Sequence, residues 1–285
     1  MRAWLLLLTL ALAPSSARAQ ELRWSEAWSR VDPASYVVSS VGVAGALTFD
    51  QLYETPDEAW VRGPLLFDAA VRRAFRGPTL DDRERAATLS DVLFVGLLAW
   101  PVLDSLVVAG LGRQSPDVAW QLVSITSEVV ALDFVLSTLL KAVVHRERPH
   151  ADECSLADRR LRPDRCGTRG RTRSFYSGHT SAGFAYAGAV CMSHAYLPLY
   201  GDAGADAFAC GAAMATASIV AVLRLLSDRH WASDVIVGAL IGLSTGLVMP
   251  YLLHYGWDPR DDATTPTATS PLVEAPATLS FSGSF

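Results

Sequence analysis

Residues 118–144 read VAWQLVSITSEVVALDFVLSTLLKAVV, a mostly apolar stretch that is long enough to cross a bilayer as a helix at about 1.5 Å per residue. The stretches 89–111, 179–199, 207–226 and 233–255 have a similar length and character. Hydrophobic residues make up 51% of the chain and its mean hydropathy is +0.24, which is high for a soluble protein. We therefore expect an all-α, integral-membrane helical bundle of five or six spans with a basic loop outside the membrane.

Two weaker helical patterns precede all five of these stretches. Residues 37–49 are apolar but short, so they are marginal as a span and could instead form an interfacial or re-entrant helix. Between Phe67 and Phe75, apolar side chains recur at the three-and-four spacing of one helical face, and Gly77 and Pro78 follow as a stop. This pattern predicts an amphipathic helix that lies on the membrane surface or packs against another part of the protein.

The first residues, MRAWLLLLTLALAPSSARAQ, have the composition of a secretory signal. One arginine precedes an apolar core, and Ala17-Arg18-Ala19 has the small-x-small arrangement of a signal-peptidase site. We expect export with Gln20 as the mature N-terminus, and an uncleaved signal anchor is the alternative. The predicted regions are a signal peptide (1–19), an N-terminal region (20–87), a membrane-embedded core (88–256) and a flexible C-terminal tail (257–285).

The segment 145–177 connects two of the apolar stretches and is polar, rich in arginine and punctuated by glycine. Its positive charge predicts an entrance that attracts anions, and a solvated cytoplasmic loop that follows the positive-inside rule is the alternative. Cys154 and Cys166 lie in this loop at a spacing that permits a disulfide in an exported protein. Cys191 and Cys210 lie in apolar stretches, so we expect them to be small core residues.

Four acidic residues fall within the apolar stretches. An ionisable side chain that faces lipid in the middle of a membrane costs on the order of 3 kcal/mol, so these residues should point inward or towards an interface. We expect structural polar contacts between helices rather than catalysis. The residues are Asp91, Asp104, Glu128 and Asp133.

Three clusters of polar residues lie at the ends of apolar stretches: KAVVHRERP (141–149), SFYSGHTS (174–181) and RLLSDRHWASD (224–234). Because helices reverse direction between spans, these ends meet at one membrane face. In the second cluster, His179 follows a Ser-Gly pair at a helix start, where free N–H groups favour anions and an imidazolium can protonate a leaving oxygen.

The other two clusters supply cations and an oriented imidazole. Lys141 and Arg148 are about two helical turns apart and can grip one anion, to which Arg224 adds a planar guanidinium. Asp234 follows His230 by about one helical turn, so its carboxylate can accept a hydrogen bond from the imidazole and aim the second nitrogen at a substrate. Such an imidazole is a candidate nucleophile.

These clusters resemble the signature of the type 2 phosphatidic acid phosphatase superfamily, which reads K-x6-RP, then PSGH, then SR-x5-H-x3-D. The superfamily also includes bacterial acid phosphatases and vanadium haloperoxidases. The chain departs from the signature at Tyr176, which replaces the proline, and at Leu223, which replaces a serine that could hydrogen-bond phosphate. The matching residues are Lys141, Arg148, Pro149, Ser177, Gly178, His179, Arg224, His230 and Asp234.

The resemblance implies a phosphatase that works through a phosphohistidine and needs no metal or other cofactor. His230 would attack phosphorus, Asp234 would orient it, and His179 would protonate the leaving oxygen and then activate water. Fixed positive charges would neutralise the phosphate oxygens in place of a metal. The implied phosphate-binding residues are Lys141, Arg148, Ser177, Gly178 and Arg224.

An apolar bundle with a basic rim predicts membrane lipids as surroundings and an amphiphilic phosphate as substrate. Phosphatidate, phosphatidylglycerophosphate, a polyprenyl diphosphate and a lipid A phosphate all fit. The formal net charge of −5 does not suggest a nucleic-acid partner. A vanadate-dependent haloperoxidase and a non-catalytic binder of anionic lipids are the alternative functions.

The expected location is a bacterial-type inner membrane with the catalytic face on the periplasmic or extracellular side. This orientation follows if the signal is cleaved and residues 37–49 do not span, and it suits two cysteines in the basic loop. If residues 37–49 do span, the catalytic face moves to the cytoplasm, which the arginine excess would favour.

Overall fold

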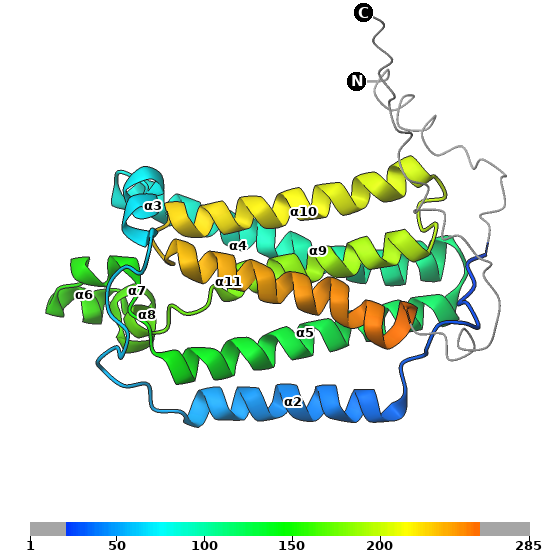
Figure 1. Ribbon diagram of the computed structural model, residues 1–285, viewed down its shortest axis with the longest axis horizontal. Coiled ribbons are helices and arrows are strands. Elements are labelled where there is room, and N and C mark those ends of the chain that lie inside the picture. The colour runs from blue at the N-terminus through cyan, green and yellow to red at the C-terminus, as the bar shows by residue number, and fades with distance from the viewer. Residues whose placement is uncertain (1–20, 257–285) are drawn as a thin grey trace, which may run out of the picture.

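The computed structural model describes residues 21–256, whose regular elements are helices, apart from a single bridge between Val61 and Arg146. The longest helices lie side by side with their axes roughly aligned, which confirms the predicted all-α bundle (Figure 1). Within the described residues, four stretches are long and apolar enough to cross a membrane: Leu80–Gly112, Pro116–Val144, Ala203–Leu226 and Ala232–Tyr255. The long helices are α2 (Pro33–Leu52), α4 (Leu80–Leu103), α5 (Pro116–Val144), α9 (Gly178–Tyr196), α10 (Ala203–Leu226) and α11 (Ala232–Leu243).

Two of these helices continue as wider π-helical turns. Helix α4 runs on into η1 (Asp104–Gly112), and α11 runs on into η3 (Ser244–Val248) and η4 (Tyr251–Tyr255). A proline precedes two of these three segments, Pro101 before η1 and Pro250 before η4. Proline has no N–H to donate, so it interrupts the regular α-helical hydrogen-bond pattern, and the last turns are rearranged rather than broken.

Helix α9 lies in the middle of the bundle, in contact with α4, α5, α10 and α11. The sequence predicted a span at 179–199, but this helix is buried along most of its length and is not among the stretches apolar enough to face lipid. Its small residues allow close packing: a Cβ added to Gly188 would lie 2.6 Å from the carbonyl carbon of Gly246 in η3. A central helix of this kind can be less apolar than its neighbours because protein surrounds it.

Helix α2 forms an outer edge of the bundle and runs beside α5 (Figure 1). It begins at Pro33, after Asp32 caps it by accepting a hydrogen bond from the Ser35 N–H at 2.9 Å. Its 20 residues span about 30 Å, so the segment predicted to be marginal belongs to a helix of full crossing length. Its outward side chains, such as Val38 and Val41, are exposed and apolar.

One end of the bundle carries the long connections, and we call it the loop end (Figure 1). The C-terminal ends of α5 and α10 and the N-terminal ends of α9 and α11 all lie there, so the three polar clusters meet as the helix reversals predicted. The short elements at this end are α3 (Asp68–Phe75), η2 (Pro149–Glu153), α6 (Leu156–Leu161), α7 (Pro163–Cys166) and α8 (Thr168–Thr172).

Helix α3 is the predicted amphipathic helix. Its polar side packs against the protein, because Asp68 is buried and Arg72 contacts Asp228 in the turn between α10 and α11. Its apolar side remains free, with Phe67 and Phe75 both more than two-fifths exposed. The helix therefore packs on protein with one face and offers the other to its surroundings.

The acidic residues in the spans behave differently from one another. Three are buried and contact another helix, as expected: Asp104 lies 3.2 Å from His194, Glu128 lies 2.7 Å from His254, and Asp133 accepts a hydrogen bond from Ser181. Asp91 is the exception, since its side chain is 58% exposed.

Both pairs of cysteines form disulfides. The structure joins Cys154 to Cys166 within the loop end, and it joins Cys191 of α9 to Cys210 of α10. The second bond corrects the prediction that Cys191 and Cys210 are separate core residues. They face each other across two packed helices, with Cα atoms 4.4 Å apart, a proximity that their apolar sequence surroundings do not reveal. The predicted signal peptide (1–19) and tail (257–285) lie outside the described residues.

Candidate active site

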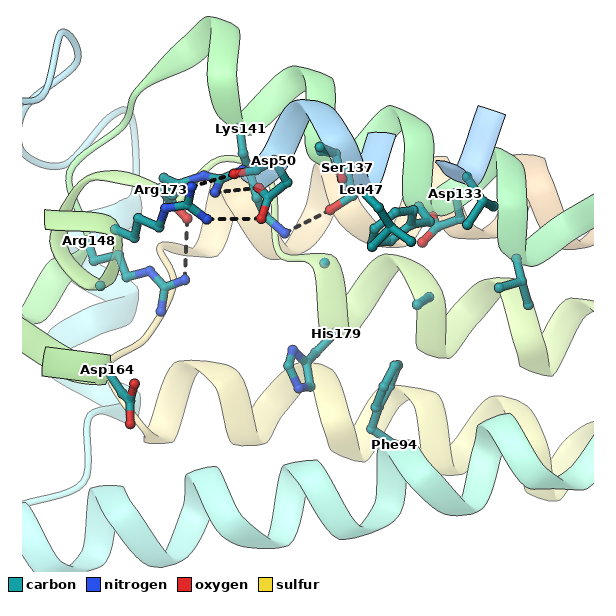
Figure 2. A pocket seen from close by; sticks show the side chains of 18 of the residues that line it. Leu47, Asp50, Phe94, Asp133, Ser137, Lys141, Arg148, Asp164, Arg173 and His179 are labelled. Atoms are coloured by element: carbon teal, nitrogen blue, oxygen red, sulfur yellow. Dashed lines mark hydrogen bonds and ion pairs between the residues drawn. The ribbon is translucent and has the colours of Figure 1, made fainter. Parts of the chain in front are cut away.

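A cavity of about 820 Å³ opens at the loop end, and residues of the first two clusters line it (Figure 2). Lys141 comes from the last turns of α5, Arg148 from the residue before η2, and Gly178 and His179 from the first turn of α9. In Figure 2, His179 lies across the open space from Lys141 and Arg148. Four positions of the signature thus surround one space that can hold an anion.

The cavity is polar at the loop end and apolar towards the bundle interior. Arg173 and Asp50 form an ion pair at the polar end, with 2.7 Å between their nearest atoms (Figure 2). The apolar part is lined by side chains from α2, α4 and α5, among them Leu47, Phe94 and Phe134. The same cavity therefore has a charged end and an apolar wall.

Two cations of the cavity, Lys141 and Arg148, lack carboxylate partners within the described residues. Lys141 donates to Ser137 Oγ at 2.8 Å and Arg148 donates to the Arg173 carbonyl at 3.3 Å, but within residues 21–256 neither lies within 4 Å of a carboxylate oxygen. Burial lowers the pKa of Arg148 below its ordinary value, and the nearby cations Arg229 and Arg224 lower it further. A bound anion would relieve this repulsion.

Gly178 lets the start of α9 approach this charge. A Cβ at this position would lie only 2.7 Å from Nζ of Lys141 and 3.0 Å from Oγ of Ser137. A larger residue would therefore displace the lysine ammonium from its position beside the helix start. The glycine of the second cluster is explained by this close approach as well as by its backbone N–H.

His230 is buried in the turn between α10 and α11. Its Nδ1 lies 2.8 Å from the carbonyl oxygen of Ser174, and a carbonyl can only accept, so Nδ1 carries the proton. The lone pair is then on Nε2. Burial lowers the pKa of His230 well below its ordinary value, and Arg148, Arg224 and Lys141 lower it further. The ring is therefore neutral at pH 7 and able to act as a nucleophile.

Asp234 orients this histidine by a different route from the one expected. Its Oδ2 is 3.9 Å from Nδ1 of His230, too far for a hydrogen bond. The same oxygen instead accepts from Ser174 Oγ at 2.6 Å and from the Trp231 N–H at 3.0 Å. Asp234 thus fixes Ser174, whose carbonyl holds the imidazole, and Ser174 is a site residue that the sequence did not single out.

A buried ion network supports Asp234. Arg146 lies 2.6 Å from both Asp234 and Asp68, and its side chain and both carboxylates are at most 1% exposed. Asp68 also accepts from the N–H and hydroxyl of Ser233, each at 2.8 Å. This network ties α3 to the first turn of α11. Sequence reasoning missed it because Arg146 was one of many arginines in the basic loop and Asp68 lies far away in the chain.

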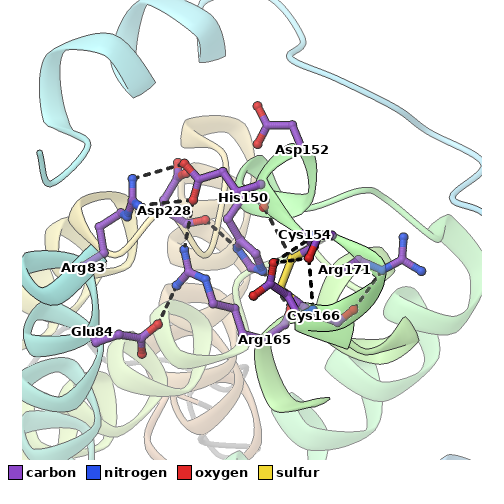
Figure 3. Close-up of a disulfide and its surroundings, with 12 residues drawn as sticks. Arg83, Glu84, His150, Asp152, Cys154, Arg165, Cys166, Arg171 and Asp228 are labelled. Atoms are coloured by element: carbon purple, nitrogen blue, oxygen red, sulfur yellow. Dashed lines mark hydrogen bonds and ion pairs between the residues drawn. A yellow bond between two sulfur atoms is a disulfide. The ribbon is translucent and has the colours of Figure 1, made fainter. Parts of the chain in front are cut away.

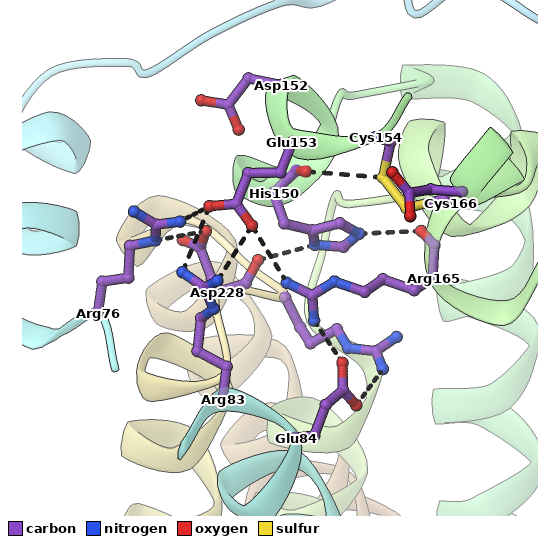
Figure 4. A network of polar contacts seen from close by, with 12 residues as sticks. Arg76, Arg83, Glu84, His150, Asp152, Glu153, Cys154, Arg165, Cys166 and Asp228 are labelled. Atoms are coloured by element: carbon purple, nitrogen blue, oxygen red, sulfur yellow. Dashed lines mark hydrogen bonds and ion pairs between the residues drawn. A yellow bond between two sulfur atoms is a disulfide. The ribbon is translucent and has the colours of Figure 1, made fainter. Parts of the chain in front are cut away.

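The turn that carries His230 is also held from outside. Asp228 adopts a left-handed conformation with φ of 57°, which Asp tolerates better than most residues, and its carboxylate lies 2.8 Å from Arg72 and 3.0 Å from Arg76. Its carbonyl oxygen lies 2.9 Å from Nδ1 of His150. Figure 4 shows the adjoining contacts, in which Glu153 pairs with arginines from α3 and α4.

The disulfide between Cys154 and Cys166 closes the basic loop beside this network (Figure 3). Replacing both cysteines by serine is expected to lower the free energy of unfolding by about 3 kcal/mol, because the bond constrains an unfolded loop with a sequence separation of 12. Thermal unfolding in detergent would measure the loss. Trypsin should also cut the variant faster after Arg159 and Arg160, and equal melting with an unchanged cleavage rate would contradict the expectation.

Two of the remaining predicted site residues, Arg224 and Ser177, do not line the cavity. Arg224 is buried and does not line the cavity, and its Nη1 lies 3.1 Å from Asp91. Ser177 is also buried, and its hydroxyl pairs with Thr180 at 2.8 Å rather than pointing into the cavity. Tyr176, at the proline position of the signature, is fully buried, with its hydroxyl 3.5 Å from the Asp133 carbonyl.

Comparison with known proteins gives a match over residues 122–258 to the family model described as the PAP2 superfamily. The region 122–258 of this chain belongs to the PAP2 superfamily. The matched region includes the three clusters that carry the PAP2 signature. It excludes α2, α3 and α4, and therefore also Asp68 and Asp91.

A curated PAP2-type relative is the lipid A 1-phosphatase of Porphyromonas gingivalis, which is 38% identical over 88 residues. This alignment covers 30% of the present chain and 17% of the relative, so the chain matches about a sixth of that protein. No solved structure matches the chain significantly.

Proposed function

We propose that this PAP2 protein is a metal-independent phosphatase that hydrolyses a lipid phosphate monoester or diphosphate through a phosphohistidine. The observation that supports the proposal most strongly is the state of His230, which is neutral, holds its Nδ1 proton against a carbonyl and keeps a lone pair on Nε2. The nearby cations Lys141 and Arg148 lack carboxylate partners in the described chain and suit a phosphate.

In this mechanism, the Nε2 lone pair of His230 attacks phosphorus as the bond to the leaving oxygen breaks. His179 protonates the leaving oxygen and then accepts a proton from the water that hydrolyses the phosphohistidine. Lys141, Arg148 and Arg224 stabilise the charge on the phosphate oxygens. Asp234 acts through Ser174 to keep the imidazole aligned.

The shape of the cavity supports an amphiphilic substrate. Its polar end suits a phosphate head, and its apolar wall on α2, α4 and α5 suits a hydrocarbon chain. Among the candidate lipids, a lipid A phosphate stands first for testing because the curated relative is a lipid A 1-phosphatase. We propose a bacterial inner membrane as the location, with the loop end facing an oxidising compartment, since its basic loop holds a disulfide.

A phosphate-release screen with purified protein in detergent or vesicles tests the function. We expect release from at least one of lipid A phosphate, phosphatidate, phosphatidylglycerophosphate and a polyprenyl diphosphate, and unchanged activity in EDTA because protein cations supply the electrostatic stabilisation. Loss of activity in EDTA that added metal restores would overturn the mechanism. Halide oxidation after vanadate addition, or lipid co-purification without turnover, would favour the haloperoxidase or the lipid binder.

A further inference from the structure

Asp91 of α4 contacts two residues of the PAP2 signature, although it lies outside the region that matches the family model. Its Oδ1 is 3.1 Å from Nε2 of His179 and 3.1 Å from Nη1 of Arg224. The carboxylate is also 58% exposed on a helix of membrane-crossing character. An exposed charge at such a position is unfavourable against lipid, which calls for a functional reason.

The surroundings of His179 show what Asp91 contributes. Cations approach His179 from three directions: Arg224 on α10, Lys141 on α5 and Arg148 in the loop, while His230 lies nearby in the turn before α11. Phe94 of α4 covers the ring at a centroid distance of 4.8 Å. A general acid must hold a proton, and like charges disfavour the protonated form. Asp91 is the carboxylate within ion-pair distance of the ring in the described chain.

Building on the phosphatase function, we propose that Asp91 is a positioning residue for protonation of the leaving group. It holds Nε2 of the His179 imidazolium and the guanidinium of Arg224, and it leaves Nδ1 of His179 to give its proton to substrate. The contact between His179 and Asp91 uses Nε2, so within residues 21–256 it leaves Nδ1 available for this transfer.

The proton and electron balance needs no reactant beyond lipid phosphate and water. His230 Nε2 bonds to phosphorus, the phosphorus–oxygen ester bond breaks, and the leaving oxygen takes the Nδ1 proton of His179. Water then attacks the phosphohistidine, its proton returns to Nδ1, and the phosphorus–nitrogen bond breaks. Asp91 stays ionised throughout and balances the charge of the imidazolium.

The test is Asp91→Asn, assayed against pH with two substrates that differ in their leaving group. For an alkyl phosphate, whose alkoxide leaves poorly, we expect kcat/KM to fall by roughly 10- to 100-fold, a part of the full effect of general acid catalysis. For p-nitrophenyl phosphate, whose phenolate leaves easily, the loss should be much smaller. The alkaline limb of the pH profile should move to lower pH, because the protonated acid loses its counter-charge.

Two further variants complete the experiment. Asp91→Glu should restore part of the activity towards the alkyl phosphate, because it keeps the carboxylate. Asp81→Asn removes a charge from the same helix at an exposed pair with Arg85, and it should leave both substrates and the pH profile unchanged.

In a His179→Ala background, Asp91→Asn should cause only a small additional loss, through Arg224, since Asp91 and His179 act as one unit. Two results would overturn the inference and leave Asp91 as a contact between α4 and α10. One is an equal loss for both substrates with an unchanged pH profile, and the other is a full additional loss in the His179→Ala background. Failure of the wild-type protein to release phosphate from any substrate would instead overturn the phosphatase function.

Discussion

Replacement of His230 by alanine is expected to lower phosphate release by about 10⁴-fold or more, to the background of the assay. The expected effect is this large because, in the proposed mechanism, this side chain forms the bond to phosphorus, and the Ser174 carbonyl fixes the tautomer that leaves its Nε2 lone pair free. Initial rates with the best lipid phosphate of the screen, measured in detergent, would give the ratio.

The variant must also be shown to fold. His230 contributes one hydrogen bond to the Ser174 carbonyl, so its loss is expected to cost only about 1 kcal/mol of hydrogen bonding plus the lost packing of the ring. A monodisperse elution profile and a clear melting transition would therefore accompany the loss of turnover. A folded His230→Ala protein that retained a tenth of the wild-type rate would exclude this residue as the nucleophile.

Replacement of Arg146 by methionine is expected to lower the free energy of unfolding by about 3–5 kcal/mol. The arginine pairs with Asp68 and Asp234, each at 2.6 Å and fully buried, so its removal leaves two buried carboxylates without their counter-charge. Activity should fall as well, because Asp234 holds Ser174 and Ser174 holds His230. Thermal unfolding and phosphate release, measured on the same preparations, would test both effects.

The matched control is Arg62→Met. Arg62 forms an exposed pair with Glu58, with side chains 60% and 84% exposed, and such pairs contribute about 0–1 kcal/mol. Asp68→Asn combined with Arg146→Met should recover part of the stability, since it removes one of the unpaired charges. Equal melting temperatures for Arg146→Met and Arg62→Met would contradict the role of the buried network.

The sequence predicted the bundle and the meeting of the three clusters because both depend on local patterns. Apolar length identifies helices such as α5, and helix reversal then places Lys141, His179 and His230 at one end. The lower hydropathy of α9 fits a central position, but hydropathy alone does not show which helices surround it, because those contacts depend on packing. The pairing of Cys191 with Cys210 depends on the same packing.

The contacts that align the site residues could not be predicted from the sequence either. Arg146 binds a residue of α3, and Asp91 reaches across to α9 and α10, so each contact depends on tertiary structure rather than on spacing along the chain. The direct contact expected between Asp234 and His230 followed from helical spacing alone. In the structure, the Ser174 carbonyl takes the position at the imidazole, and the Ser174 hydroxyl donates to Asp234.

Helix α2 links the membrane orientation to the N-terminal region. Residues 21–32 lie at the opposite end of the bundle from the loop end (Figure 1), and Trp24 and Trp28 there pack against Tyr255. If α2 crosses the membrane, the residues before it and the loop end lie on opposite sides. Export of Gln20 as the mature N-terminus would then place the loop end in the cytoplasm, and a loop end outside the cytoplasm would require Gln20 to stay inside. Labelling of Cys154 in intact cells with an impermeant thiol reagent, after reduction, distinguishes them: reaction places the loop end outside.

The most direct measurement is the trapping of phosphorus on the protein during turnover. Wild-type protein mixed with a ³²P-labelled lipid phosphate and quenched in alkali within the first turnover should carry label on His230. The bond should be stable to alkali and cleaved by acid, as expected for phosphorus bound to an imidazole nitrogen, and the label should disappear in a chase with unlabelled substrate. Label on another residue, or rapid turnover with no labelled protein at any quench time, would contradict a phosphohistidine at His230.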